Sequence, residues 1–246
     1  GQSLAFFAKL RRRAFHRELG HLRAVVFVPR NAPPGKIDRM RAGGAEIRFT
    51  EDYAEAETRS REFAEREGAY FLAHGDERAV ESYGALGLDL LTNVARREDP
   101  DVGLDRLVRW FDLKARSGSL NSSEAGELSA LDTALSGIEN TAFLIPVGAG
   151  GVVAGVDFAL KSIDSRLTVI GVDSSRADPM AQSLARGEIV SQSPAPDILE
   201  NGIAVNAPEP LAFQTAAGLL DAMVTVPFES VAGAVRAHWE EAGVVS

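Results

Sequence analysis

The sequence predicts an α/β protein built on doubly wound parallel sheets. Short apolar runs rich in β-branched residues alternate with longer helix-like segments along most of the 246 residues, and such runs are typical of parallel strands buried on both faces. Strands that alternate with helices in this way favour a parallel sheet covered by those helices. With 45% hydrophobic and 25% charged residues, the chain can bury one large core or two modest ones.

The first part of the chain contains three predicted strands and the helices between them. A helix-like segment precedes the first strand, which Pro29 ends. Prolines begin the next helix, and Gly43 and Gly44 end it, as expected from the positional preferences of these two residues. The predicted elements are, in order, a helix at 4–19, a strand at 24–28, a helix within 32–44, a strand at 45–49, a helix at 51–68 and a strand at 69–73.

The alternation breaks between residues 93 and 140. This stretch is long and polar, and it contains SGSLNSSEAGE at residues 117–127, a composition typical of a flexible loop. We therefore interpret 93–140 as an insertion or a linker. It is expected to be poorly ordered or helical and to lie outside both sheets, and its deletion is expected to leave the fold intact.

Strands and helices alternate again after residue 140. The first strand of this part ends in a cluster of glycines, and a helix-like pattern follows the cluster. The predicted elements are a strand at 141–147, the glycine loop, a helix at 152–163, a strand at 167–173, a helix at 178–187, a strand at 222–226 and a helix at 230–243.

Composition excludes several classes of function. The chain has no cysteine, which excludes disulfides, thiolate metal sites and a cysteine nucleophile and fits a reducing compartment. The net charge of −9 argues against nucleic acid as the main partner, and the basic run at 9–17 is interpreted as a solvated helix face. No stretch approaches the roughly 18 apolar residues of a membrane span, and the Arg-rich start lacks the apolar core of a signal peptide. A soluble cytoplasmic protein is expected.

The glycine cluster is the first candidate site. In FLIPVGAGGVVAGVDFALKS, residues 143–162, Gly148, Gly150 and Gly151 stand between a predicted strand and a predicted helix. In a parallel sheet this junction lies at the carboxyl edge, where ligands bind, and the N–H groups that begin the helix form a site for an anion. Glycine also lets the backbone approach a phosphate closely. The alternative is that the three glycines only make a tight turn.

One phosphate ligand to consider is a dinucleotide. Its binding motif requires G-x-G-x-x-G and an acidic residue about 20 positions further on, at the end of the next strand. Asp173 meets the second requirement. The first is met poorly, because Val153 occupies the place of the third glycine, although Gly155 could serve a looser variant.

The other interpretation depends on a resemblance that covers nearly the whole chain except 93–140. PVGAGGVVAG, residues 146–155, resembles the tetraglycine phosphate loop of the fold-type II pyridoxal-phosphate enzymes, the tryptophan synthase β superfamily. Further segments resemble threonine and serine dehydratases and serine racemases in the same order: GQSLAFFAKL (1–10), VFVPRNAPPGKIDRMRAGGAEIRF (26–49) with the helix 51–68, ESYGALGLDLL (81–91) as a glycine-centred helix start, VIGVDSSRADPMAQSLARGE (169–188), ILENGIAV (198–205) and DAMVTVPFESVAGAV (221–235). We favour this family over a dinucleotide domain.

The resemblance implies two domains and a cofactor site. A small α/β domain is expected at 1–74 and a large one at 75–246, which carries the phosphate loop and the insertion. The cofactor is pyridoxal 5'-phosphate, with its phosphate on the backbone N–H groups of Gly148, Ala149, Gly150 and Gly151, and with Val152 starting the helix. Ala149 replaces a usual glycine, which requires that its φ be negative.

The resemblance also places Gly202 close to the pyridine ring. Because Asn-Gly is a strong turn pair on its own, an ordinary turn is an equal alternative for Gly202. The implied reaction is that of an ammonia-lyase (dehydratase), in which a hydroxy amino acid such as threonine or serine loses its β-hydroxyl and gives a keto acid and ammonia. An amino-acid substrate and a homo-oligomer are expected, without a nucleic-acid or membrane partner.

The catalytic lysine of the family is missing from the sequence. The resemblance places it upstream of Gly1 in a Ser-x-Lys-x-Arg context, and none of Lys9, Lys36, Lys114 and Lys161 stands in that context. Lys36 and Lys161 are expected to be exposed helix lysines, and Lys9 and Lys114 lie in charged, surface-like runs. We interpret the chain as a fragment that is shortened at both ends, or as a non-catalytic relative that binds a phosphorylated ligand or a partner. No catalytic residue is assigned.

A cation site is a further expectation from the resemblance. Serine racemase-like members hold a cation with an acidic residue at the end of the strand after the loop and with ligands four and six residues later, which correspond to Asp173, Ala177 and Pro179 here. Pro179 offers only its carbonyl, and Asp178 is one place out of register. The four histidines are scattered without zinc-site spacing, and no Gly-x-Ser-x-Gly elbow or P-loop lysine is present.

Overall fold

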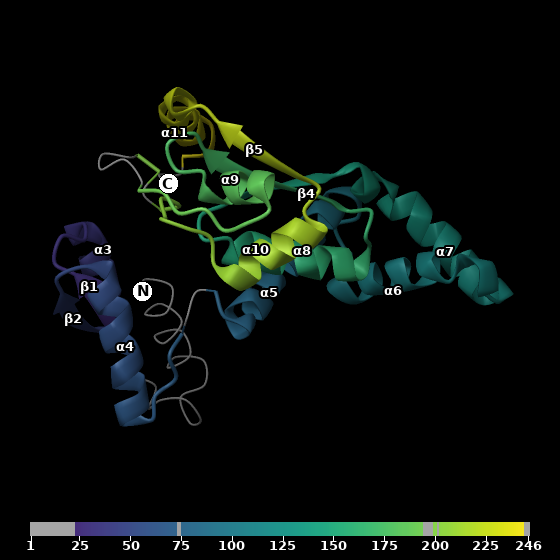
Figure 1. Cartoon of the computed structure of the whole chain (residues 1–246). Helices are drawn as coiled ribbons and strands as arrows, with labels where there is room; N and C mark the ends of the chain where they lie inside the picture. Colours follow the sequence, from purple (N-terminus) through teal and green to yellow (C-terminus); the bar gives the residue numbers. More distant parts are fainter. Residues whose placement is uncertain (1–22, 73–74, 194–198, 201, 244–246) are drawn as a thin grey trace. The chain divides into compact units, whose positions relative to one another are not determined.

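The computed structural model describes residues 23–72, 75–193, 199–200 and 202–243. The chain divides into two compact units, Gly1–Leu72 and Ala73–Ser246, and the predicted domain boundary at residue 74 lies beside this division. Each unit contains a parallel sheet, which confirms the predicted α/β class (Figure 1). The helix predicted at 4–19 lies outside the described residues.

The smaller unit is a two-stranded parallel sheet with helices between and after its strands. Its elements are β1 (Val25–Pro29), α3 (Pro34–Ala42), β2 (Glu46–Thr50) and α4 (Tyr53–Glu67), and Val25 pairs with Glu46 in the register. The carboxylate of Asp52 accepts the Glu55 N–H at 2.8 Å and so caps α4. Val28, Ile37 and Met40 form the buried core of this unit.

The strand predicted at 69–73 is absent from the described residues 69–72. Gly68 ends α4 with φ 61°, and the chain then carries Tyr70 and Leu72, which are 57% and 42% exposed. An apolar run becomes a strand only where a neighbouring strand accepts its backbone groups. This run instead stands where the chain passes from one unit to the other, so the prediction was wrong.

The larger unit is a three-stranded parallel sheet with strand order β3-β4-β5. Ala142 pairs with Thr168, and Ile170 pairs with Ala222. One face of β3 is buried through Phe143 and Ile145. The elements are α5 (Glu77–Glu98), α6 (Leu104–Ala115), η1 (Ser117–Ser119), α7 (Ser122–Leu135), η2 (Ser136–Asn140), β3 (Ala142–Pro146), α8 (Gly151–Ile163), β4 (Thr168–Ser174), α9 (Pro179–Arg186), α10 (Pro210–Leu219), β5 (Ala222–Val226) and α11 (Phe228–Ala242).

Three glycines bring α5 and α8 together. A Cβ at Gly155 of α8 would lie 2.2 Å from the carbonyl oxygen of Val80, and one at Gly87 of α5 would lie 3.0 Å from that of Val156. Gly84 faces Gly155 across the same contact. The segment expected to start a helix, 81–91, therefore lies inside α5, and Gly155 is explained by helix packing rather than by a dinucleotide motif.

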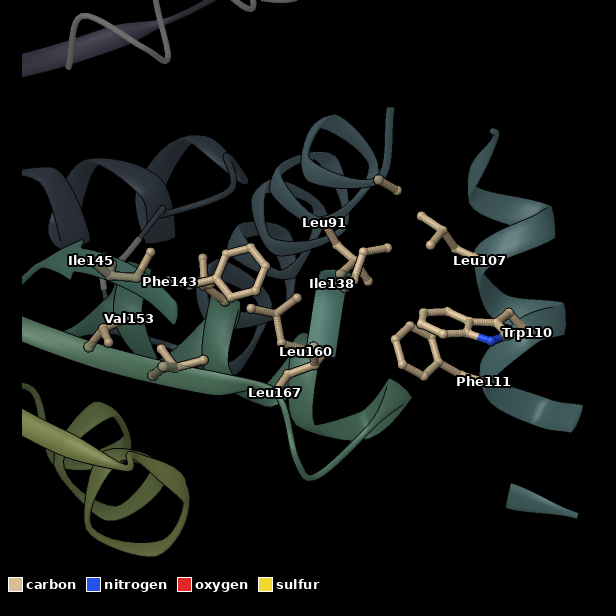
Figure 2. Packing of buried hydrophobic residues seen from close by; sticks show 14 of the residues in the cluster. Leu91, Leu107, Trp110, Phe111, Ile138, Phe143, Ile145, Val153, Leu160 and Leu167 are labelled. Carbon is tan, nitrogen blue, oxygen red and sulfur yellow. The ribbon is translucent and has the colours of Figure 1, made fainter. Parts of the chain in front are cut away.

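Residues 93–140 are mostly helical and contribute to the core of the larger unit. They lie outside the sheet, as expected, at the opposite end of this unit from α11 (Figure 1). However, Leu107, Trp110 and Phe111 of α6 are buried in one cluster with Leu160 and Leu167 (Figure 2). The interpretation of a removable insertion is therefore not supported by the packing, because its removal would expose this apolar surface.

The predicted flexible loop at 117–127 is instead η1 and the start of α7. Asn121 accepts the Glu124 N–H at 3.0 Å, and Glu124 accepts the Asn121 N–H at 3.1 Å. This reciprocal pair is a capping box, which satisfies N–H groups that have no acceptor inside the helix. The N-S-S-E pattern carried this signal, but the serines and glycines around it have the composition of a loop.

Candidate phosphate-binding site

The glycine loop leaves the sheet at its carboxyl edge. The Val147 N–H donates to the carbonyl of Val172 at 2.9 Å, one residue beyond the end of β3. Four residues later α8 has begun, and its first internal hydrogen bond runs from the Ala154 N–H to the Gly150 carbonyl at 2.9 Å. The N–H groups of Gly151, Val152 and Val153 precede that bond and have no acceptor within the helix. Such free N–H groups attract an anion.

Gly150 requires glycine for its backbone conformation. It is the N-cap of α8 with φ 95° and ψ −8°, which is the left-handed region that other residues seldom adopt. A Cβ there would also lie 2.4 Å from Met180 Cε and 2.9 Å from Ala212 Cβ. Any other residue at this position is therefore strained by both conformation and contact.

Gly148 requires glycine for a different reason. A Cβ there would lie 2.9 Å from the carbonyl oxygen and 3.1 Å from the Cα of Ile203. The backbone of the segment after Gly202 therefore packs directly on the start of the loop. Ala149 has a negative φ, because no non-glycine among the described residues has a positive one. The requirement that alanine at position 149 have a negative φ is therefore met.

The loop is also hydrogen-bonded to the start of α10, a helix that was not predicted from the sequence. The Glu209 N–H, at the start of that helix, donates to the Ala149 carbonyl at 2.9 Å. This bond gives the Ala149 carbonyl a partner at the start of α10. The sequence signal for α10 was the proline at its first position followed by an alanine- and leucine-rich run.

Gly202 lies in the Glu200–Ile203 turn, where the Ile203 N–H donates to the Glu200 carbonyl at 3.0 Å. A Cβ at Gly202 would meet nothing within 4 Å. No contact with the described residues requires glycine there, so its proposed place beside a ring stays a prediction. The residue of this turn that touches the loop is Ile203, which sequence reasoning did not single out.

Asp173 is buried at the end of β4 and is 1% exposed. Its Oδ2 accepts the Ala181 N–H at 3.3 Å, and its Oδ1 has no partner among the described residues. Burial, with a smaller effect of the nearby carboxylate of Asp178, raises the pKa of Asp173 to about 7 against the opposing effect of the Ala181 N–H. A carboxyl group held in this way inside the protein is poorly placed to contact the ribose of a dinucleotide.

The cation site expected at Asp173 and Ala177 stays a prediction. Ala177 is fully buried in the turn after β4, and its N–H donates to the Ser174 carbonyl at 2.9 Å. Within the described ranges, no group of three or more His, Cys, Asp or Glu side chains is placed to hold a metal ion.

Two of the lysines are paired with carboxylates. Lys161 lies about 15 Å along α8 from Gly151, at about 1.5 Å per residue, and its Nζ is 2.7 Å from Asp221 Oδ2. Its side chain is 9% exposed, so the expectation of an exposed lysine was wrong. Lys114 pairs with Asp132 at 3.2 Å and with Glu139 at 2.6 Å. Lys36 belongs to the smaller unit, and Lys9 lies outside the described residues.

Similar proteins of known function match nearly the whole chain. It is 28% identical over 225 residues to an L-threonine ammonia-lyase of Thermotoga maritima, covering 91% of this chain and 45% of the relative. It is also 28% identical over 229 residues to an L-threonine ammonia-lyase of Geobacter sulfurreducens, covering 92% of this chain and 46% of that protein. The chain thus spans about half the length of the curated relatives it matches.

Solved structures show the same fold. Serine racemase from Dictyostelium discoideum superposes with a TM-score of 0.67 and 18% identity over 99% of this chain and 61% of that one. The processed form of threonine deaminase isoform 2 from Solanum lycopersicum gives a TM-score of 0.67 and 24% identity over 97% of this chain and 57% of the other.

The sequence profile of one family covers both units of the chain. It is described as "Pyridoxal-phosphate dependent enzyme" and matches residues 1–104 and 127–246. The unmatched residues, 105–126, lie inside the stretch that breaks the sequence pattern. The chain therefore belongs to the family of pyridoxal-phosphate dependent enzymes.

Proposed function

We propose that this chain forms the cofactor-phosphate site of a pyridoxal-phosphate-dependent ammonia-lyase that acts on a hydroxy amino acid such as threonine or serine. The observation that carries the proposal is the loop at Gly148–Gly151, which contains the left-handed Gly150 and leaves the first N–H groups of α8 without an acceptor inside the helix. The names of the relatives from Thermotoga maritima and Geobacter sulfurreducens supply the reaction and the substrate class.

The residues of the loop fit a phosphate group. The N–H groups of Gly148, Ala149, Gly150, Gly151 and Val152 would bind it, and the dipole of α8 would add about 0.3 to 1 kcal/mol, or up to about 2 kcal/mol in a partly buried site. Glycine at positions 148 and 150 lets the loop pack closely on Ile203, Met180 and Ala212, and this packing fixes the backbone that would present the N–H groups. Gly202 is proposed to pass beside the ring of the same ligand.

Bound pyridoxal phosphate supplies the electron sink that stabilises a carbanion at the α-carbon of an amino acid. This chain contributes the anchoring of the phosphate and the orientation that follows from it. A lysine in the family's Ser-x-Lys-x-Arg context is not among the 246 residues. The proposed activity therefore belongs to a protein that also holds such a lysine, and a non-catalytic phosphate-binding relative is the second candidate.

Several expectations accompany the proposal. A homo-oligomer and a cytoplasmic location are proposed on the resemblance to this class of enzymes. None of the helices in the described part of the chain is long and apolar enough to cross a membrane. A cation at Asp173 and Ala177 would need ligands beyond these two, since one carboxylate and one carbonyl complete no coordination shell.

The experiment is a binding titration of the 246-residue chain with pyridoxal phosphate, inorganic phosphate and a nicotinamide dinucleotide. Inorganic phosphate should compete with pyridoxal phosphate on the unchanged protein. Gly150→Val should abolish binding of both, because valine cannot adopt the left-handed φ and meets Met180. Ala149→Gly should preserve or improve binding, and Asp173→Ala should leave it unchanged.

The alternatives give different outcomes. Tightest binding of the dinucleotide, weakened by Asp173→Ala, would replace the proposal with a dinucleotide site. Failure of inorganic phosphate to compete would show that the loop holds no phosphate. Because Gly150→Val also perturbs packing, its unfolding midpoint is measured alongside, and the competition on the unchanged chain does not depend on that variant.

A further inference from the structure

A hydrogen bond between the buried Ser174 and the partly buried Glu200 links the end of β4 to the Glu200–Ile203 turn. The Ser174 hydroxyl donates to Glu200 Oε1. Ser174 is the last residue of β4, pairs with Val226 in the sheet and is 1% exposed. Its position is therefore set by the sheet, whereas Glu200 belongs to a connection between α9 and α10. The hydrogen bond anchors that connection to a rigid strand.

The anchored turn is the segment that touches the phosphate loop. The backbone of Ile203, three residues after Glu200, packs closely against Gly148. A Cβ added at Gly148 would lie 2.9 Å from the Ile203 carbonyl oxygen. The turn is closed by the bond from the Ile203 N–H to the Glu200 carbonyl at 3.0 Å. A displacement of Glu200 therefore moves the backbone that lies on Gly148.

Little else among the described residues holds the Glu200 side chain. Its Oε2 is buried without a hydrogen-bond partner in the described part of the chain, so the Ser174 hydroxyl is the contact that offsets the desolvation of this carboxylate. Hydrogen bonds to charged groups are stronger than those between neutral groups. Loss of either partner should release the turn.

We propose that Ser174 and Glu200 are a positioning pair that holds the Glu200–Ile203 turn against Gly148 and thereby shapes the phosphate loop for its ligand. This inference depends on the proposed function, because it assigns the pair to the same phosphate site. Neither residue needs to touch the phosphate. Their effect reaches the ligand through the backbone of Ile203 and Gly148.

The test measures the dissociation constants of inorganic phosphate and pyridoxal phosphate for four variants of the 246-residue chain. Ser174→Ala and Glu200→Ala should each weaken both ligands by about tenfold, in line with the loss of one hydrogen bond to a charged group. The double variant should bind each ligand no more weakly than the single variant with the larger dissociation constant, because the two side chains act through one hydrogen bond. Glu200→Gln should stay within about threefold of the unchanged chain, since an amide oxygen still accepts from Ser174.

Ser175→Ala is the matched control for Ser174→Ala. The Ser175 hydroxyl accepts the Phe228 N–H at 3.1 Å and has no bond to the described residues of the turn, so its removal should leave both dissociation constants unchanged. The unfolding midpoint of every variant is measured in parallel. A role in stability alone would lower the midpoints of Ser174→Ala and Glu200→Ala while both dissociation constants stayed the same, and this result would overturn the inference.

Two further results separate this inference from the proposed function. If the unchanged chain binds both ligands and the two single variants weaken them additively, to about a hundredfold in the double variant, the residues do not act as a pair. If the unchanged chain binds neither ligand, the proposed phosphate site is wrong, and the positioning role is wrong with it.

Discussion

Asp157 should make the larger unit less stable as the pH rises from about 4 to about 6. This residue lies on α8, is 0% exposed, and neither of its carboxylate oxygens has a partner among the described residues. Burial raises the pKa of Asp157 to about 6, while Lys161 opposes the increase and Asp221 adds to it. Lys161 offers little compensation, because its Nζ is held by both oxygens of Asp221 at 2.9 and 2.7 Å.

The sign follows from the two protonation states. Below about pH 4 the carboxyl is protonated in both the folded and the unfolded chain, and its burial carries no charge penalty. Between about pH 4 and 6 the unfolded chain loses this proton first, so the free energy of unfolding falls. Above the folded pKa of about 6 the loss is complete. A difference of about two pKa units corresponds to about 3 kcal/mol.

Asp157→Asn should remove this dependence. The amide also lacks partners, but the free-energy cost of burying it does not change with pH. Relative to the unchanged chain, the free energy of unfolding of the variant should therefore rise by up to about 3 kcal/mol between pH 4 and pH 8. Urea denaturation followed by tryptophan fluorescence measures this, since Trp110 is fully buried in the same cluster as Leu160 of α8. An equal difference between variant and unchanged chain at pH 4 and pH 8 would refute the reasoning.

Asp164→Asn supplies a control of opposite sign. Burial raises the pKa of Asp164, but the hydrogen bonds from Arg166 outweigh burial and hold that pKa below its usual value. The stabilisation that ionised Asp164 gives the folded chain is present above its unfolded pKa and is lost as the pH falls. Asp164→Asn should therefore lose stability relative to the unchanged chain at neutral pH and lose less in acid.

Four other predictions follow from the packing and the composition. Gly155→Ala should lower the free energy of unfolding by about 1 to 3 kcal/mol, because the added Cβ would lie 2.2 Å from the Val80 carbonyl oxygen. Gly233→Ala on α11 is the control, since a Cβ there meets nothing within 4 Å. Equal unfolding midpoints for the two variants would contradict the account of the contact between α5 and α8. Trp110→Ala should lower the free energy of unfolding by about 3 to 5 kcal/mol. Deletion of residues 105–126 should unfold the larger unit, and a deletion variant with an unchanged denaturation profile would restore the interpretation of a removable insertion. Borohydride treatment with pyridoxal phosphate should give no stoichiometric lysine adduct by mass spectrometry, and a full adduct on Lys9, Lys36, Lys114 or Lys161 would overturn the account of the site.

The sequence by itself determined the fold class, most of the elements and the place of the glycine loop between β3 and α8. Strands β3 and β4 were predicted because their apolar runs are short, β-branched and bounded by turn residues, and these are local properties. The loop was found for a similar reason: proline, valine and glycines in a fixed order describe one backbone path. The left-handed conformation of Gly150 then follows from the path itself.

Only the tertiary structure decided which segments share a core and which side chains are paired. Composition separated 93–140 from the rest, yet Trp110 and Phe111 of this region face Leu160 and Leu167 (Figure 2). Lys161 reads as an exposed helix lysine until Asp221, 60 residues later, covers it. The run at 69–73 has the composition of a strand but no neighbouring strand in its described part. Burial, pairing and close contacts between distant residues depend on the whole fold, because each requires a partner that local sequence does not contain.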